Sequence, residues 1–257
     1  MKYGLIGKSL KHSFSPAYFA DKFKSEGLID HQYKAYELDD LNAATLNELV
    51  LSESLHGFNI TIPYKENILP FIDVISEDAK AIGAINTVFV DWKLDHTYTL
   101  NGYNTDWKGF LKAIRPFLTV HHQKALILGT GGASKAIAYA LKSLGIDYFF
   151  ASRIKQGQGS NVINYIELNQ YAMAQFKLII NTTPLGTFPD IEGCPDIPYQ
   201  YVGSNHLLCD LVYNPSETMF MREGKKHGAA VMNGLSMLQF QADESWDIWK
   251  NKKGHSY

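Results

Sequence analysis

The sequence has no long apolar run. Nowhere do about 18 consecutive residues stay hydrophobic, which is the length that a membrane-spanning helix needs. In residues 1–7, lysine and glycine interrupt the apolar stretch too early for the core of a secretory signal peptide. We therefore expect a cytoplasmic protein with no membrane partner.

Cysteine is scarce, with Cys194 and Cys209 as the only two in the sequence. Their spacing fits neither a metal site nor a redox pair, and a reducing compartment suits them best. The 9 histidines are scattered, and no cluster of histidine, cysteine and acidic residues has the spacing of metal ligands. The sequence therefore predicts no metal site.

An excess of charge of one sign is also absent. The chain has 24 Lys and Arg against 26 Asp and Glu, for a formal net charge of -2, with no basic block. A nucleic acid attracts its protein partners chiefly through such a basic surface. We therefore expect no nucleic-acid partner, and a small molecule is the expected ligand.

The chain does contain enough apolar residues for a packed core, since 46% of its 257 residues are hydrophobic and 19% are charged. Segments with strand and helix periodicity alternate through its first hundred residues, which predicts a small open α/β sheet. We expect strands at 3–6, 33–38, 57–62 and 84–92, and helices at 16–27, 41–55 and 76–82.

A glycine cluster follows the strand expected at 124–129 and leads into an apolar helix that ends near residue 144. A strand, a glycine turn and a helix N-terminus together form a binding site for a dinucleotide pyrophosphate, because glycines admit the phosphates and helix amides face them. The turn residues expected to bind the cofactor are Gly129, Gly131, Gly132 and Ala133.

This glycine turn lies more than a hundred residues into the chain, so a separate structure must precede it. We expect a substrate-binding domain of residues 1–105, completed by a C-terminal helix within 235–257. A Rossmann-like domain of residues 106–234 follows it, with a helix at 106–117 linking the two. Its further strands are expected at 148–152, 178–181, 207–212 and 230–232.

The segment after the strand at 148–152 indicates which dinucleotide binds. An acidic residue usually follows this strand in NAD-binding domains and bonds the ribose 2′-hydroxyl, yet residues 148–166 contain no Asp or Glu. Instead, Ser152, Arg153 and Lys155 occur at the end of the strand, and a guanidinium suits a 2′-phosphate, which predicts NADP. Alternatively, Arg153 and Lys155 are part of a solvated loop.

The segment that follows is unusual for a dinucleotide-binding domain. Residues 155–161 are glycine-rich, so we expect a loop there instead of a crossover helix.

Two hydroxyls, Ser13 and Ser15, lie two residues apart in a loop before Pro16, where a helix can begin. Both can face one ligand, and hydroxyls helped by nearby amides suit a carboxylate. Ser15 is also in the position of a helix cap, which would explain it without a ligand.

A strand expected at 57–62 carries Asn59 and Thr61 on one face, because side chains alternate along a strand. Pro63 ends the strand and Lys65 follows it. A single lysine is usually a surface charge. This one comes after two inward polar residues at the carboxyl end of a strand, where open α/β sheets bind ligands.

Two further polar residues, Asn86 and Asp106, lie at the boundaries of expected strands and helices. Asn86 opens a strand, and Asp106 precedes the apolar spacing of the next helix. Asp106 could simply cap that helix. The two roles are compatible because a carboxylate has several acceptor sites.

Together these motifs resemble the shikimate dehydrogenase family in order and spacing, over nearly the whole chain. The resemblance rests on seven motifs: Ser13-Phe-Ser15-Pro16, Asn59-Ile-Thr61-Ile-Pro63-Tyr-Lys65, Gly83-Ala-Ile-Asn86-Thr87, Gly102-Tyr-Asn104-Thr105-Asp106, Gly129-Thr-Gly131-Gly132, Asp210-Leu-Val-Tyr213-Asn214-Pro215 and Gly234-Leu-Ser-Met237-Leu-Gln-Phe-Gln241.

The resemblance implies a substrate domain joined to an NADP-binding domain, with the active site in the cleft between them. It implies NADPH-dependent reduction of 3-dehydroshikimate to shikimate in the biosynthesis of aromatic amino acids. Lys65 and Asp106 match the catalytic pair, and Gly234 matches a cofactor-binding residue. The implied substrate contacts are Ser13, Ser15, Thr61, Asn86, Tyr213 and Gln241.

The chain departs from the family at Ser152-Arg153-Ile154, where Asn-Arg-Thr is usual. Three questions stay open at this point. Lys65 is either the proton donor or an electrostatic clamp, and the chain is a monomer or a homodimer. The alternative functions are a quinate/shikimate dehydrogenase that uses NAD, and a non-catalytic sensor of NADP or a metabolite.

Overall fold

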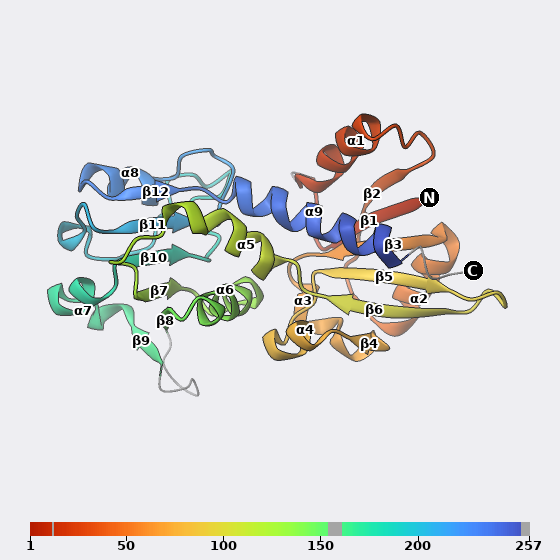
Figure 1. Cartoon of the computed structure of the whole chain (residues 1–257), viewed down its shortest axis with the longest axis horizontal. Helices are drawn as coiled ribbons and strands as arrows, with labels where there is room; N and C mark the ends of the chain where they lie inside the picture. The colour runs from red at the N-terminus through yellow and green to blue at the C-terminus, as the bar shows by residue number, and fades with distance from the viewer. Residues whose placement is uncertain (12, 154–160, 253–257) are drawn as a thin grey trace. The chain divides into compact units, whose positions relative to one another are not determined.

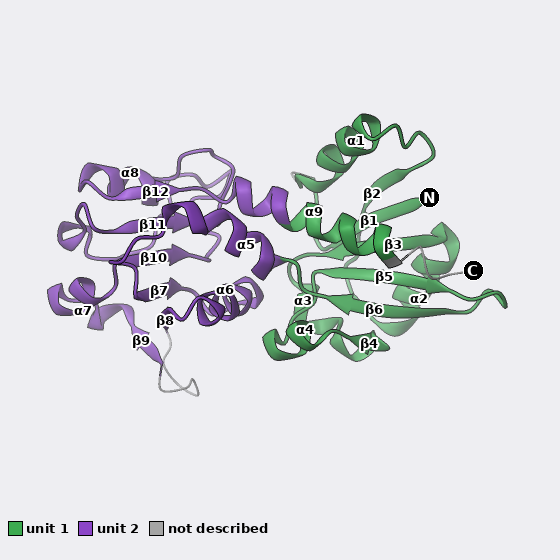
Figure 2. Ribbon diagram, in the orientation of Figure 1, with its two compact units in different colours: residues 1–105, 241–257 green, residues 106–240 purple. Residues whose placement is uncertain are grey.

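The computed structural model describes residues 1–11, 13–153 and 161–252 (Figure 1). The chain forms two compact units, which Figure 2 colours separately. Unit 1 consists of Met1–Thr105 and Gln241–Tyr257, and unit 2 consists of Asp106–Phe240. None of the helices in the described ranges is long and apolar enough to cross a membrane.

Unit 1 is built on a mixed six-stranded sheet with the order β2-β1-β3-β5-β6-β4. β1 pairs in parallel with β2 and β3, whereas β5 runs antiparallel to both β3 and β6. The strands are β1 (Lys2–Gly7), β2 (Gln32–Glu37), β3 (Leu55–Ile60), β4 (Val74–Ile75), β5 (Thr87–Trp92) and β6 (Tyr98–Tyr103).

Two hydrophobic cores stabilise this sheet. One joins α2 to the sheet through Leu46, Val50 and Phe58. The other joins α1 and the end of α9 through Phe19, Phe23, Trp246 and Trp249, so the last helix packs on the first domain as the sequence predicts. The helices are α1 (Ser15–Ser25), α2 (Ala43–Glu53), α3 (Tyr64–Asn67), η1 (Leu69–Phe71), α4 (Glu77–Ile82) and α9 (Leu235–Lys252).

Unit 2 contains an entirely parallel sheet with the order β12-β11-β10-β7-β8-β9. Counted from β7, this is the strand order of dinucleotide-binding folds, in which successive strands are added first on one side of the first strand and then, from the fourth strand on, on its other side. The strands are β7 (Lys124–Leu128), β8 (Asp147–Ser152), β9 (Val162–Asn164), β10 (Leu178–Asn181), β11 (Leu207–Asp210) and β12 (Ala230–Met232).

Both faces of the unit 2 sheet are buried, as parallel sheets require. Ala125 and Ile127 of β7 join the core formed with α5 and α6, while Leu126 and Leu128 join the core formed with α7 and α8. The helices of this unit are α5 (Asp106–Ile114), η2 (Arg115–Phe117), α6 (Gly132–Ser143), η3 (Tyr165–Glu167), α7 (Gln170–Gln175), η4 (Tyr199–Tyr201) and α8 (Met219–Lys226).

The α/β class is confirmed, but several boundaries differ from the sequence predictions. β3 ends at Ile60, so Thr61 and Ile62 lie beyond the strand, and Ile62 is 72% exposed. β6 was not predicted at all, because its Asn101 and Gly102 are poor strand formers. The loop predicted at 155–161 falls almost entirely outside the described residues.

Candidate active site

Ser13 and Ser15 lie at the start of α1 in unit 1. Ser15 is the first residue of that helix and is buried, and Phe14 occupies the cap position without a side-chain hydrogen bond. The interpretation of Ser15 as a helix cap is therefore wrong. Its side chain instead acts on the phenol of Tyr33, whose pKa it lowers against the larger effect of burial. Ser13 is half-buried, and its amide donates to the carbonyl of Leu10 at 2.9 Å.

Lys65 is the second residue of the short helix α3 and is half-buried. Its carbonyl accepts a 2.8 Å hydrogen bond from the amide of Ile85, the residue just before Asn86. The amide of Thr61 donates to the carbonyl of Ile6 at 2.9 Å and so continues the pairing of β3 with β1. These bonds bring the segments that carry Thr61, Lys65 and Asn86 together at one end of the central strands, where β3 ends and β5 begins.

Asn86 and Gln241 meet inside unit 1. Asn86 is 2% exposed, and its side-chain Nδ2 donates to Gln241 Oε1 at 3.3 Å and to Thr105 Oγ1 at 2.9 Å. Asn86 Oδ1 accepts the backbone amide of Thr105 at 2.7 Å. The structure thus joins two predicted substrate contacts that lie 155 residues apart in the sequence.

Asn59 lies beside this pair and is almost fully buried. Its Nδ2 donates to Thr87 Oγ1 at 3.1 Å and to Ser245 Oγ at 3.0 Å, while its Oδ1 accepts the Tyr33 hydroxyl at 2.8 Å. Burial raises the pKa of the Tyr33 phenol well above its ordinary value, and the side chain of Ser15 acts in the opposite direction. One buried polar network therefore runs from Tyr33 through Asn59 and Asn86 to Gln241.

Asp106 begins helix α5 of unit 2 and is 5% exposed. It is the first residue of the helix and not the residue before it. A carboxylate in the first turn is still favourable, because the helix dipole places partial positive charge there. Asp106 follows Thr105 directly, whose amide is held by Asn86.

The glycine turn of unit 2 connects β7 to α6 and fits a dinucleotide pyrophosphate. Gly129 has φ +104°, and a Cβ there would lie 3.0 Å from Thr182 Oγ1. Gly131 is the N-cap of α6 and has no side chain that could cap the first amides of this helix. A Cβ on Gly131 would meet no atom within 4 Å. The open space and uncapped amides suit a phosphate approaching from outside.

Ser152 is the last residue of β8, and Arg153 follows it with an exposed side chain. The Arg153 carbonyl accepts a 3.1 Å hydrogen bond from Asn164 Nδ2 of β9, which fixes the backbone at this point. Burial raises the pKa of the Tyr165 phenol, and the positive charge of Arg153 acts in the opposite direction. Lys155 lies outside the described residues, and Gly132 and Ala133 form the first turn of α6.

Tyr213 is half-buried and follows β11 in unit 2, three residues after the buried Asp210. Gly234 is explained by packing alone, since a Cβ there would lie 2.0 Å from the carbonyl oxygen of Leu211. Its amide also donates to the carbonyl of Val212 at 3.1 Å. A cofactor contact at Gly234 stays a prediction.

The predicted residues thus gather in two groups, one in each unit. Thr87 and Ser245 join the polar network of the unit 1 group, and our interpretation of the sequence gave neither of them a role. Ser245 follows Gln241 by four positions, so both lie on one face of α9. That spacing is the signal that could have identified it.

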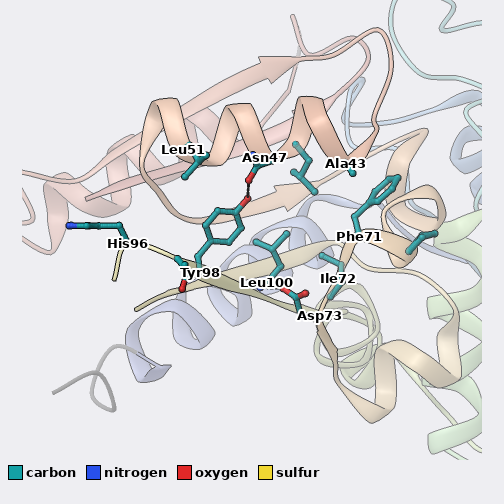
Figure 3. A pocket seen from close by; sticks show the side chains of 12 residues that line it. Ala43, Asn47, Leu51, Phe71, Ile72, Asp73, His96, Tyr98 and Leu100 are labelled. Carbon is teal, nitrogen blue, oxygen red and sulfur yellow. Dashed lines mark hydrogen bonds between the residues drawn. The ribbon is translucent and has the colours of Figure 1, made fainter. Parts of the chain in front are cut away.

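Unit 1 also contains a pocket of about 610 Å³ between α2, η1 and the turn after β5 (Figure 3). Tyr98 donates a 2.5 Å hydrogen bond to Asn47 Oδ1 in this pocket, and Asp73 accepts the backbone amide of Leu100. The predicted site residues are not among those that line it, so this pocket is separate from the candidate site.

Comparison with known proteins agrees with the two-unit structure. Residues 5–88 match a family model described as the shikimate dehydrogenase substrate binding domain. A protein of Caldicellulosiruptor saccharolyticus named shikimate dehydrogenase (NADP(+)) is 40% identical over an alignment 261 residues long. The alignment covers 96% of this chain and 91% of that protein.

Two solved structures are similar over almost the whole chain. Shikimate dehydrogenase from Aquifex aeolicus has a TM-score of 0.85 and 32% identity, covering 98% of this chain and 92% of that one. Shikimate 5-dehydrogenase from Thermus thermophilus, in complex with NADP(H) and shikimate, has a TM-score of 0.83 and 30% identity, covering 98% and 94%. The chain belongs to the shikimate dehydrogenase family.

Proposed function

We propose that this protein is an NADP-dependent oxidoreductase that reduces 3-dehydroshikimate to shikimate. The observation that carries the proposal is the full-length similarity to NADP-dependent shikimate dehydrogenases. All seven motifs that match this family fall within that similarity. The reaction would serve the biosynthesis of aromatic amino acids.

The residues of unit 1 would bind and orient the substrate. Ser13 and Ser15 would bind its carboxylate, assisted by Tyr213 from unit 2. The hydroxyl of Thr61 and the carboxamides of Asn86 and Gln241 would contact the ring hydroxyls. Both carboxamides are nearly buried and hydrogen-bonded to each other, which supports a rigid recognition site.

Lys65 would act on the carbonyl oxygen that is reduced, and Asp106 would act on a ring hydroxyl. Negative charge grows on the carbonyl oxygen during reduction, and the Lys65 ammonium would stabilise it and donate the proton. Asp106 would accept a hydrogen bond from a ring hydroxyl and so orient the ring toward Lys65. The low exposure of Asp106 supports this role, because charge interactions are stronger away from water.

NADP would supply the hydride when bound. The turn of Gly129, Gly131, Gly132 and Ala133 would hold the pyrophosphate against the uncapped start of α6. Ser152 and Arg153 would bind the 2′-phosphate, together with Lys155. The absence of an acidic residue from 148 to 166 supports NADP over NAD.

The test is an absorbance assay at the reduced-nicotinamide band with purified protein. Each of shikimate and quinate is paired with each of NADP and NAD. The proposal requires the highest kcat/KM for shikimate with NADP. Faster oxidation of quinate with NAD would favour the quinate/shikimate dehydrogenase instead. Binding of NADP without turnover of either substrate would favour a sensor.

We also propose that the enzyme works in the cytoplasm as a monomer or homodimer. Cys194 and Cys209 are both free thiols, which supports a reducing compartment. Analytical ultracentrifugation over a range of protein concentrations would decide between monomer and homodimer.

A further inference from the structure

Ser245 lies at the centre of the buried polar network of unit 1, with its residue 0% exposed. Its hydroxyl has four partners: Asn59 Nδ2 at 3.0 Å, Thr87 Oγ1 at 2.8 Å, Thr105 Oγ1 at 3.2 Å and the Gln241 carbonyl at 2.9 Å. A serine in a helix commonly bonds the carbonyl four residues before it. The three further partners come from separate segments, which indicates a second role.

The orientation of the two carboxamides follows from one backbone group. The amide of Thr105 can only donate, and it lies 2.7 Å from Asn86 Oδ1. Asn86 Nδ2 must therefore be the atom that faces Gln241, and it donates to Gln241 Oε1. The Nε2 group of Gln241 then points to the other side of its carboxamide, as a hydrogen-bond donor.

The hydroxyl hydrogens decide whether this orientation is stable. Thr105 Oγ1 accepts a bond from Asn86 Nδ2 and lies within 3.2 Å of both Asn86 Oδ1 and Thr87 Oγ1. The Ser245 oxygen can accept from Asn59 and from one of the threonines while its hydrogen goes to the Gln241 carbonyl. Without Ser245, these donors lose a shared acceptor and can turn toward other oxygens of the network.

We propose that Ser245, together with Thr87, is a positioning residue for substrate recognition. The two hydroxyls hold the carboxamides of Asn86 and Gln241 in one orientation, in which Gln241 offers Nε2 to a hydroxyl of the substrate ring. This inference rests on the proposed function for the identity of that ring. Both residues act through Asn86 and Gln241.

Three variants separate positioning from packing. Ser245→Ala and Thr87→Val remove a hydroxyl with little change of volume, whereas Thr87→Ser keeps the hydroxyl and removes a methyl group. We expect KM for shikimate to rise about fivefold in the first two, the effect of one hydrogen bond, and to stay within about twofold in Thr87→Ser. KM for NADP should not change. A packing role predicts the opposite order, with Thr87→Ser the more damaged of the two Thr87 variants.

Ser143→Ala is the matched control, because the Ser143 hydroxyl also bonds a carbonyl of its own helix but belongs to α6. It should leave both KM values unchanged. Amide hydrogen exchange at Thr105 gives a readout independent of activity, since this amide reports on Asn86 Oδ1. Exchange should be several-fold faster in Ser245→Ala than in the wild type.

The outcomes distinguish this inference from the proposed function. A wild-type protein without shikimate oxidation would refute the function, and the exchange rate at Thr105 would still test the positioning. Unchanged exchange in Ser245→Ala overturns the inference, and so does an unchanged KM in an active enzyme. Loss of thermal stability without either change would assign Ser245 to packing.

Discussion

The carboxylate of Glu37, at the end of β2, accepts a 2.6 Å hydrogen bond from the backbone amide of Leu10. Leu10 is buried, and its carbonyl accepts the amide of Ser13 at 2.9 Å. Glu37 therefore holds the backbone from which Ser13 would reach the substrate carboxylate. The link is indirect, because Glu37 acts through Leu10.

Glu37→Ala should raise KM for shikimate about fivefold, because the loss of one part-buried hydrogen bond loosens the segment that carries Ser13. The values of kcat and of KM for NADP should stay within about twofold. Glu37→Gln keeps an acceptor oxygen and should have a smaller effect. Steady-state kinetics decides, with Glu77→Ala as the control, since Glu77 is an exposed carboxylate that pairs with Lys80 on α4. An equal change in the control would contradict the role of Glu37.

Lys65→Ala should lower kcat by about a hundredfold or more, because the growing charge on the substrate oxygen loses its proton donor. The backbone bond from Ile85 to the Lys65 carbonyl does not need the side chain, so the fold should survive. Circular dichroism and thermal melting check the fold, and Lys80→Ala serves as an exposed lysine control. Turnover within tenfold of the wild type would remove Lys65 from the mechanism.

The sequence predicts which residues form the candidate site, but it does not predict their local geometry. Spacing points to Lys65 and Asn86, because strand ends in an α/β sheet collect polar residues, and their roles stay predictions. It does not tell which of two roles a residue has, and Ser15 and Asp106 show this. Each could cap a helix, and in the structure each is the first residue of one.

Contacts between distant segments account for what the sequence could not predict. β6 forms although Asn101 and Gly102 disfavour strands, because it pairs along its whole length with β5. The role of Ser245 depends on Thr87 and Thr105, which lie more than a hundred residues before it. A pattern read along one segment cannot show such a network.

Arg153→Ala should raise KM for NADP about ten- to a hundredfold and leave KM for NAD nearly unchanged. A charge-assisted bond between the guanidinium and a 2′-phosphate accounts for this size, and NAD lacks that phosphate. The two cofactors thus form an internal control within one variant. Steady-state kinetics at saturating shikimate, with NADP and with NAD, compares the two KM values of the variant with those of the wild type. An equal loss with NAD would mean that Arg153 supports the fold of this segment instead.

Asp210 should make the stability of the protein depend on pH. Burial raises the pKa of this carboxyl from 3.8 to about 6, against the opposing hydrogen bonds from Thr218, Val212 and Asn181. Between these two pH values the folded protein keeps a proton that the unfolded chain releases. Its contribution to stability is therefore complete below about pH 4 and is lost as the pH rises through 6, by up to about 3 kcal/mol.

Asp210→Asn should remove this part of the pH dependence. The asparagine oxygen can still accept the Val212 amide, and its Nδ2 can donate to Thr218, so the fold should persist. Urea unfolding of the wild type and of Asp210→Asn at several pH values from 4 to 8 gives the free energy of unfolding of each protein as a function of pH. The slopes of these two pH dependences are compared. Identical slopes in the two proteins would show that other groups dominate.

Gly129 and Gly131 should respond differently to alanine, because only one of them is constrained by the protein itself. Gly129 has φ +104°, and a Cβ there would lie 3.0 Å from Thr182 Oγ1 and 3.1 Å from Thr183 Cγ2. Gly129→Ala should cost about 1–3 kcal/mol in the free energy of unfolding.

A Cβ on Gly131 meets nothing within 4 Å, and its φ of -80° suits any residue. Gly131→Ala should therefore melt at the wild-type temperature, while KM for NADP rises about tenfold or more because the methyl group occupies space that the pyrophosphate needs. Thermal melting without cofactor and NADP kinetics test the two halves of this prediction. Normal NADP affinity in Gly131→Ala would mean that the pyrophosphate does not approach this turn, and the assignment of the turn as the cofactor site would be wrong.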